Sequence, residues 1–342
     1  MTEKLLLKAL QGQPTQRVPF WFMRQAGRYL PEYRELRASK GGFLNLVYDP
    51  KAACEITLQP IRRFQMDGAI LFSDILVIPQ ALGQTLEFTA GEGPQLGDLN
   101  LASLKPENIH QTLSPIYETV SNIRAGLTSE GFHHTTLIGF AGSPYTLACY
   151  MIEGHGSKDF GAAKHYALQN PANFSSLIDI LVEATISYLS AQVKAGAEAL
   201  QLFESWSSMA DAQGFEDWII KPTARIIRQL RALHPDIPII GFPKGAGAML
   251  GRYAKETGIQ GLGIDSLTPL NWAAEQAGPA IILQGNLDPW ALAAGGEAMK
   301  SRARAILGSM KNRPFIFNLG HGIDKSTPVE HVEALARIVQ EY

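Results

Sequence analysis

Residues 69–74 read Ala-Ile-Leu-Phe-Ser-Asp, a short apolar run that ends abruptly on a carboxylate. A run this short and this continuously hydrophobic is typical of a strand buried on both faces in a parallel sheet. Longer segments that read as helices separate it from seven similar runs, which lie at 18–23, 136–140, 199–203, 237–242, 261–265, 280–283 and 315–319. The alternation predicts an α/β fold built on a parallel sheet.

Several of the intervening segments carry recognisable boundaries. An Asp-Pro pair opens 49–64, and an Asn-Pro pair opens 170–196, where we expect a helix to about residue 194 and a stop at the final glycine. Residues 327–330, Thr-Pro-Val-Glu, have the capping-box pattern and predict the start of the C-terminal helix. Residues 84–99 read as a Gly-rich excursion, for which a hairpin is one option.

About eight strands with helices between them, and no linker rich in Pro, Ser or charge, favour one (β/α)8 barrel spanning residues 1–342 as a single domain. A doubly wound sheet is the structural alternative. It should carry a dinucleotide fingerprint after an early strand, but the best candidate, Gly245-Ala246-Gly247, comes late and has Leu250 where glycine is required. The same loop lacks the Gly-Lys-Ser/Thr end of a P-loop, so we interpret it as a βα turn.

Composition narrows the classes of partner. Only 18% of the 342 residues are charged and the formal net charge is −2, so the composition does not favour nucleic acid or an anionic membrane as a binding partner. No uncharged apolar run approaches transmembrane length, and the first ten residues read as a helix start and not as a signal peptide. Cys54 and Cys149 stand in unrelated contexts, so we expect packing residues and a reducing, cytoplasmic location.

In a barrel the chemistry lies at the carboxyl ends of the strands, so the residues just after each run are the candidates. Those positions hold Arg24, Asp74, Gly142-Ser143, Glu204-Ser205, Lys244, Asp265, Asn286, Asp288 and His321. A lone carboxylate between two apolar runs, as Asp74 is, is costly to bury unless it is paired or hydrogen-bonded. A structural ion pair with an arginine is the alternative for Asp74, and Glu204 is the better candidate for such a role. His321 lies between two glycines that allow close approach, and a purely structural histidine is its alternative.

Three arginines, Arg24, Arg28 and Arg37, follow the first apolar run within a short stretch. A guanidinium stays charged at any working pH and grips carboxylate or phosphate through a planar fork of donors. The cluster therefore indicates an anionic substrate. The alternative is a set of solvated surface charges paired with Glu32 and Glu35.

Metal and nucleophile motifs find little support in the sequence. There is no HExxH or GxSxG, and His133-His134 has no cysteine or acidic ligand at a usual spacing. We therefore predict a reaction that needs neither metal nor organic cofactor. Arginines, carboxylates, hydroxyls and a histidine around an apolar mouth suit a large, flat polyanion with an apolar body.

With these residues in view, the chain resembles the uroporphyrinogen decarboxylase family over nearly its whole length. The likeness is strongest at 22–32, 57–64 with 72–83, 139–154, 200–205 and 318–322. The resemblance implies a single (β/α)8 barrel, usually a homodimer, with neither metal nor organic cofactor. It also implies the family's reaction, the removal of CO2 from the acetate side chains of uroporphyrinogen III to give coproporphyrinogen III in haem biosynthesis.

Carried over position by position, the resemblance implies substrate-binding roles for Arg24, Arg28, Arg37, Asp74, Tyr150, Phe203, Ser205 and His321. Of these, Asp74 and Arg37 are implied as catalytic. Loss of CO2 needs an electron sink, which protonation of a pyrrole carbon creates, and the Asp74 carboxylate can stabilise the positive charge that develops. Because a guanidinium is a poor acid near neutrality, we expect Arg37 to position the reacting acetate and not to donate the proton itself.

Three positions depart from the commoner family pattern, namely Gly42, Tyr145 and Cys149. We expect them to affect the loop after Arg37 and local packing. Two other functions stay open: a corrinoid-dependent methyltransferase of the same barrel superfamily, and a non-catalytic tetrapyrrole-binding protein. The methyltransferases use a zinc site of histidine and cysteine, for which this chain is short of cysteines. A binding protein would keep the arginines but need no Asp74.

Overall fold

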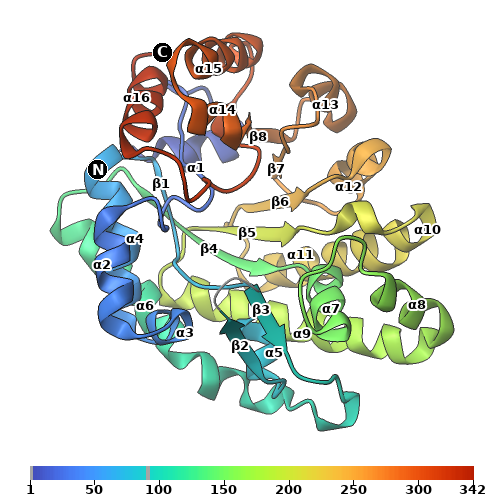
Figure 1. The fold of residues 1–342 in the computed structure, drawn as a ribbon. Coiled ribbons are helices and arrows are strands. Elements are labelled where there is room, and N and C mark those ends of the chain that lie inside the picture. Colours follow the sequence, from blue (N-terminus) through green and yellow to red (C-terminus); the bar gives the residue numbers. More distant parts are fainter. Residues whose placement is uncertain (1–2, 90–92) are drawn as a thin grey trace.

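A computed structural model describes residues 3–89 and 93–342. Seven parallel strands curl at the centre of the molecule and helices surround them (Figure 1), which confirms the predicted α/β fold. The strand order is β1-β4-β5-β6-β7-β8-β9. The bounds are β1 (Gly68–Ile70), β4 (Thr136–Gly142), β5 (Ala199–Glu204), β6 (Ile239–Pro243), β7 (Gly261–Gly263), β8 (Ile282–Leu287) and β9 (Phe315–Leu319).

The eighth predicted strand, residues 18–23, is not a full strand, and in this the prediction was wrong. It makes one parallel bridge, between Phe20 and Phe317 of β9. Backbone hydrogen bonds nevertheless join it to both edges of the sheet, because Phe317 N donates to Pro19 O and Asp67 N donates to Phe20 O, each at 2.9 Å. The carboxylate of Asp67 also accepts from Phe20 N at 2.9 Å, so a side chain replaces a ladder bond. The segment closes the barrel between β9 and β1.

The inside of the barrel contains a polar layer as well as apolar side chains. Trp21 Nε1 donates to Gln284 Oε1 at 2.8 Å, and Gln284 Nε2 donates to Gln201 Oε1 at 3.0 Å. These side chains come from the closing segment, β8 and β5, which are not neighbours in the sheet. The hydrogen bonds therefore cross the barrel interior and satisfy polar groups that would be costly to bury alone.

The helices cover the outside of the barrel (Figure 1). Their bounds are α1 (Leu5–Leu10), α2 (Pro31–Lys40), α3 (Phe43–Val47), α4 (Pro50–Phe64), α5 (Val77–Ala81), α6 (Ile109–Ser129), α7 (Pro144–Glu153), α8 (Gly161–Gln169), α9 (Pro171–Ala195), α10 (Ala212–Gly214), α11 (Lys221–Leu233), α12 (Leu250–Glu256), α13 (Leu270–Ala277), α14 (Pro289–Ala294), α15 (Gly296–Met310) and α16 (Val329–Gln340). A π-helical turn at Phe215–Ile220 leads into α11.

The predicted boundaries of α4 and α9 are confirmed, whereas the capping box before α16 is not formed. The Asp49 side chain accepts from the first backbone N–H groups of α4, and α9 ends just before Gly196. In α16 the extended Pro328 occupies the cap position, so the helix begins one residue later. Thr327 is consequently left outside the helix, buried and without a capping hydrogen bond.

The excursion at 84–99 contains a hairpin, which confirms that option. Strands β2 (Leu86–Thr89) and β3 (Gly93–Leu96) pair antiparallel, and residues 90–92 lie outside the described residues. Leu96 N donates to Gly154 O at the end of α7, at 2.6 Å. The Phe88 ring packs 4.6 Å from that of Phe43, in α3. The hairpin thus bridges the segment after α2 and the end of α7.

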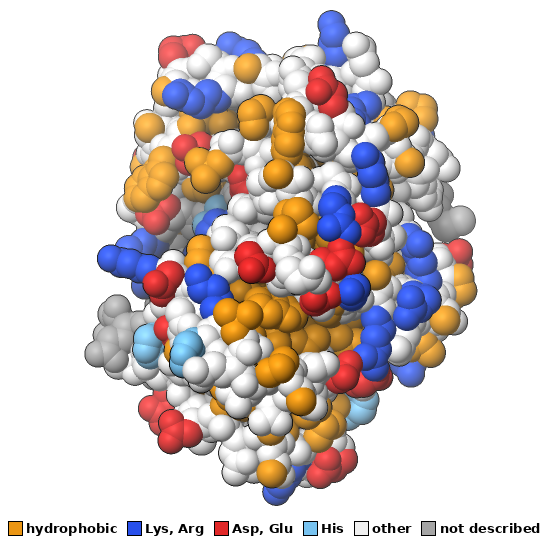
Figure 2. All heavy atoms as spheres, turned by 90° about the vertical axis from the view of Figure 1, so that its right-hand side faces the viewer, with side chains coloured by type: hydrophobic (Ala, Val, Ile, Leu, Met, Phe, Trp, Pro, Cys, Tyr) orange, Lys and Arg blue, Asp and Glu red, His pale blue; other side chains and the backbone are white. Residues whose placement is uncertain are grey.

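Helix α9 has the length and composition of a membrane-crossing helix, but 61% of its most apolar window is buried inside the protein. Its apolar face packs against α6, α7 and α11, as expected of a core helix. On the face shown in Figure 2, acidic and basic side chains are interspersed among hydrophobic ones. That face has no broad patch of side chains with one sign of charge, which is consistent with the small net charge.

Candidate active site

Most of the predicted site residues lie at the carboxyl ends of the barrel strands. Arg24 follows the closing segment, Asp74 lies four residues after β1, and His321 lies two residues after β9. Phe203 and Ser205 are at the end of β5. The remaining three are on the segments that follow or flank these ends, Tyr150 in α7, Arg28 just before α2 and Arg37 within α2.

Arg24 is held over the end of β9 by local geometry. Its backbone is left-handed, with φ of 59°, and Asn318 Oδ1 accepts from Met23 N at 2.9 Å just before it. A Cβ atom at Gly322 would lie only 2.9 Å from the Cβ of Arg24. Gly322 therefore leaves the space that the Arg24 side chain occupies, which brings Arg24 beside the loop of His321.

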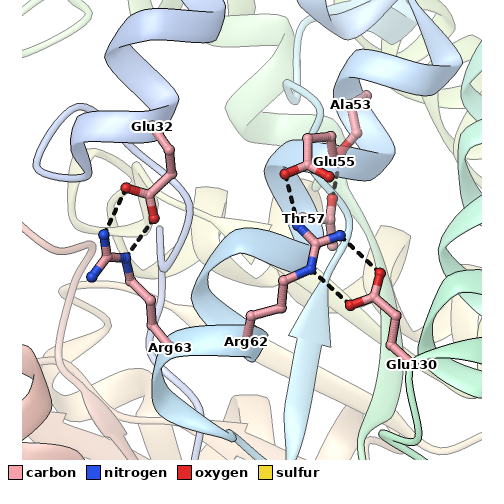
Figure 3. Close-up of polar contacts among 7 residues, drawn as sticks. All are labelled: Glu32, Ala53, Glu55, Thr57, Arg62, Arg63 and Glu130. Carbon is pink, nitrogen blue, oxygen red and sulfur yellow. Dashed lines mark hydrogen bonds and ion pairs between the residues drawn. The ribbon is translucent and has the colours of Figure 1, made fainter.

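Asp74 lies in a loop that α4 fixes through one hydroxyl. Thr57 Oγ1 donates to Ala53 O at 2.8 Å (Figure 3) and accepts from Phe72 N at 3.1 Å. The carboxylate of Asp74 accepts from Leu76 N at 2.8 Å. Among the described residues no cation lies within 4.0 Å of it, so it is not half of a structural ion pair.

The protonation of Asp74 is shifted towards neutrality. Burial raises the pKa of Asp74 to about 6, while the Leu76 N–H and the charge of Arg24 act in the opposite direction. At pH 7 the group is therefore mostly a carboxylate, yet it can take up a proton within the physiological range. Tyr150 and Arg24 both lie within electrostatic reach of it.

Helix α2, which carries Arg37, is fastened to α4 by an ion pair. Arg63 of α4 faces Glu32 of α2, with Nε and Nη2 at 2.5 and 3.0 Å from the two carboxylate oxygens (Figure 3). Glu32 is thus engaged by Arg63 and not by Arg24, Arg28 or Arg37. In the part of the chain that the structure describes, none of those three arginines has a carboxylate within 4.0 Å.

Arg37 lies beside an aromatic cluster that supports the Asp74 loop. Its guanidinium carbon is 5.9 Å from the ring centre of Phe43, and Nη1 is 3.4 Å from the Tyr33 hydroxyl. Both rings pack edge-on against Phe72, two residues before Asp74, at 5.7 and 5.8 Å. Arg37 is half-buried in this setting, whereas Arg28 is exposed. Within residues 3–89 and 93–342 no side-chain hydrogen bond ties Arg28 to the other site residues.

Aromatic rings from three strands form an apolar floor. Phe203 of β5 is half-buried and meets Phe140 of β4 and Phe242 of β6 edge-on, at 5.6 and 6.1 Å. Beside this floor, the Tyr150 ring packs against Trp206 at 6.0 Å. Burial raises the pKa of Tyr150, so its hydroxyl stays a neutral hydrogen-bonding group.

The prediction that Glu204 is part of a structural ion pair is wrong. Glu204 is fully buried, and its partner is the hydroxyl of Thr146 in α7, which donates to Glu204 and accepts from Ser205 N at 2.9 Å. Burial raises the pKa of Glu204 to about 8, which favours a neutral acid. The alternation of side chains along a strand explains why Glu204 points to the helix layer, near Tyr253 of α12, and its neighbours Phe203 and Ser205 point the other way.

His321 remains exposed at the rim, but the protein around it and two cations keep it uncharged. Desolvation, followed by the charges of Lys244 and Arg24, lowers the pKa of His321 to about 4, while Asp265 acts in the opposite direction. Lys244 is one of the strand-end candidates of the sequence, where it had no assigned role, and Trp206 beside it was not predicted. The only signal for Lys244 was its place directly after the β6 run.

Of the three positions that we expected to affect a loop or local packing, Tyr145 and Cys149 are buried, whereas Gly42 is only half-buried. Gly42 precedes α3 in extended backbone, and the Tyr145 ring stacks on Trp218 at 5.7 Å. Cys149 is fully buried and Cys54 is half-buried, both as free thiols. Within residues 3–89 and 93–342, no group of three or more His, Cys, Asp or Glu side chains is arranged to hold a metal ion.

Comparison with known proteins identifies the family of the chain. The sequence model of the family described as "Uroporphyrinogen decarboxylase (URO-D)" matches residues 1–342. A uroporphyrinogen decarboxylase of Sphingopyxis alaskensis is 54% identical over 341 residues, which cover 98% of this chain and 98% of that protein. One of Erythrobacter litoralis is 52% identical over 342 residues, covering 99% and 98%.

Among solved structures, a methyltransferase from Methanosarcina mazei superposes with a TM-score of 0.82 over 99% of both chains, at 19% sequence identity. So low an identity speaks for a shared barrel fold alone. The family match over the full length and the relatives above 50% identity decide the relationship, and the chain belongs to the uroporphyrinogen decarboxylase family of carboxy-lyases.

Proposed function

We propose that this chain removes CO2 from the acetate side chains of uroporphyrinogen III and yields coproporphyrinogen III, a step of haem and porphyrin biosynthesis. The observation that carries the proposal is Asp74, a carboxylate without a cation partner among the described residues, within electrostatic reach of Arg24. The relatives above 50% identity, each named uroporphyrinogen decarboxylase, support the choice of substrate.

Each decarboxylation consumes one proton, since R–CH2–COO⁻ and H⁺ become R–CH3 and CO2. Protonation of a pyrrole carbon first makes the ring an electron sink, the C–C bond then breaks towards it, and the methylene carbon is protonated as the ring loses its extra proton. In this proposal Asp74 accepts hydrogen bonds from pyrrole N–H groups and stabilises the cationic ring. The aromatic floor around Phe203 lowers the local dielectric and strengthens that interaction.

The cations hold the periphery of the substrate. Arg24, Arg28 and Arg37 bind its carboxylates, and each charge-assisted hydrogen bond contributes about 1.5–3 kcal/mol. Arg37, held beside Phe43 and Tyr33, positions the reacting acetate. The remaining polar contacts come from Tyr150, Ser205 and His321, the last as a neutral imidazole.

The proposed reaction uses neither metal nor organic cofactor, and the proposed assembly is a homodimer in the cytoplasm. Two large apolar side chains, Leu267 and Trp290, are 91% and 66% exposed on the segments after β7 and β8, where a second copy could cover them.

The free thiols of Cys54 and Cys149 suit a reducing compartment. The mixed charges on the face shown in Figure 2 and the net charge of −2 support a small-molecule substrate over nucleic acid or an anionic membrane.

The test is anaerobic incubation of the purified protein with uroporphyrinogen III, followed by oxidation and chromatographic separation of the porphyrins. The proposal expects species with progressively fewer carboxylates and coproporphyrin as the end product. It also expects unchanged turnover after dialysis against a chelator. Unaltered substrate would refute the function, and activity that returned only with added zinc would refute the metal-independent reaction.

A further inference from the structure

Lys244 is the first residue after β6, and its backbone is fixed to the neighbouring strand end. Lys244 N donates to Glu204 O of β5 at 2.9 Å, and Ser207 Oγ donates to Lys244 O at 2.7 Å. The base of the side chain is therefore anchored beside the segment that carries Ser205, at the carboxyl end of the barrel.

The ammonium group of Lys244 points towards the predicted site. Its Nζ lies 5.7 Å from the ring centre of Trp206, and the same indole packs against Tyr150. With Arg24, it is one of the two cations whose charges act on His321. At the carboxyl end of the barrel, Lys244 thus lies between Tyr150 and His321.

This half-buried cation has no counter-ion among the described residues, where no carboxylate lies within 4.0 Å of Nζ. The acid at the next strand end, Asp265, is engaged elsewhere. It accepts from Gly245 N at 2.7 Å, Leu267 N at 2.9 Å and Thr268 Oγ1 at 3.0 Å. The contact with the Trp206 ring does not neutralise the charge of Lys244, which is left for an anionic ligand.

We propose that Lys244 binds a carboxylate of the tetrapyrrole substrate, as a fourth cation beside Arg24, Arg28 and Arg37. The inference rests on the proposed function, which supplies a substrate with carboxylates around its rim. A lysine suits this role because its ammonium is a compact charge on a flexible stem. It can therefore follow carboxylates whose positions change as the macrocycle presents its four pyrroles in turn.

The kinetic test compares Lys244→Met and Lys244→Arg with a matched control, Lys255→Met, on the exposed side of α12. Lys244→Met should raise the KM for uroporphyrinogen by about tenfold to a hundredfold, the loss of one charge-assisted hydrogen bond, with kcat changed much less. Lys244→Arg should restore most of the affinity, and Lys255→Met should match the wild type. An unchanged KM in Lys244→Met would overturn the proposal.

Two readouts keep this inference separate from the proposed function. In the free protein, Lys244→Met should raise the pKa of His321 in an NMR titration, because one repelling cation is gone, while Lys255→Met should not. Uroporphyrin, the stable oxidised octacarboxylate, should bind Lys244→Met at least about tenfold more weakly than the wild type by fluorescence titration. Equal affinities would overturn the role of Lys244 even if the enzyme is active. If the wild type bound uroporphyrin more tightly than Lys244→Met but did not turn over uroporphyrinogen, the decarboxylase function would be refuted and the role of Lys244 would stand.

Discussion

Asp74 is a half-buried carboxylate that has no cation within 4.0 Å among the described residues, so its proposed function and its cost in stability are linked. Because Asp74→Asn keeps the shape and removes the charge, we expect turnover to fall by about a hundredfold to a thousandfold. The folded pKa of about 6 lies above the usual 3.8, so ionisation lowers stability as the pH rises through this range. Asp74→Asn should therefore melt at a higher temperature than the wild type at pH 7. Kinetics and thermal melting check both expectations, with the exposed Asp236→Asn as control. Near-normal turnover would contradict the role.

Glu204 offers a test in which only stability is at issue. Its folded pKa of about 8, against a usual 4.5, means that the protein loses stability as the pH rises from about 4.5 through 8. Glu204→Gln has no proton to lose, so it should match the wild type near pH 5 and exceed it above pH 8, by up to several kcal/mol. Urea unfolding at the two pH values measures the difference. Equal pH dependence in both proteins would show that Glu204 is ionised in the fold.

The sequence could predict residues whose position alone is informative. Asp74 and His321 were recognisable because each ends an apolar run. The hydrogen bond of Glu204 could not be predicted, because its partner Thr146 lies 58 positions away in the chain. The same holds for Lys244, whose importance depends on Trp206 and His321 and therefore on how three strand ends meet.

At the scale of elements, the loop after β1 depends on α4. Thr57→Val keeps the shape but leaves the buried Phe72 N–H without its acceptor, which should destabilise the fold by about 1–3 kcal/mol. Because the same bond holds the loop that carries Asp74, turnover should fall as well. Thr57→Ser, which keeps the hydroxyl, should restore most of both properties. Urea unfolding and kcat measure these effects, and a Thr57→Val protein as stable and as active as the wild type would contradict the argument.

Strands and helices differed in how well the sequence predicted them. Seven strands were found because a strand covered on both faces is apolar at almost every position, as β4 and β9 are. Residues 18–23 have the same composition but only one bridge, since Asp67 supplies a side-chain acceptor to Phe20. Local composition cannot indicate such a substitution. The capping box failed for a similar reason, because Pro328 took the cap position that the pattern assigns to Thr327.

At the scale of the whole molecule, the closing segment joins the last strand to the first, so the barrel needs both ends of the chain. That dependence supports the prediction of one domain over residues 1–342, which stays a prediction until unfolding is followed. Calorimetry should then show a single cooperative transition. Two separate transitions would contradict the single-domain organisation.

The proposed homodimer follows from what the carboxyl end of the barrel leaves uncovered. Trp290 and Leu267 expose large apolar surfaces after neighbouring strands, whereas Leu168, which is 71% exposed, lies on the outer helix α8. If a second copy covers the first two, light scattering at micromolar concentration should give about twice the chain mass of 37.3 kDa. Trp290→Glu would place a charge in the apolar interface and should shift the mass towards that of one chain, while Leu168→Glu should leave it unchanged. A wild-type protein that stays at the mass of one chain would refute the dimer. A dimer insensitive to Trp290→Glu would instead move the interface to another face of the barrel.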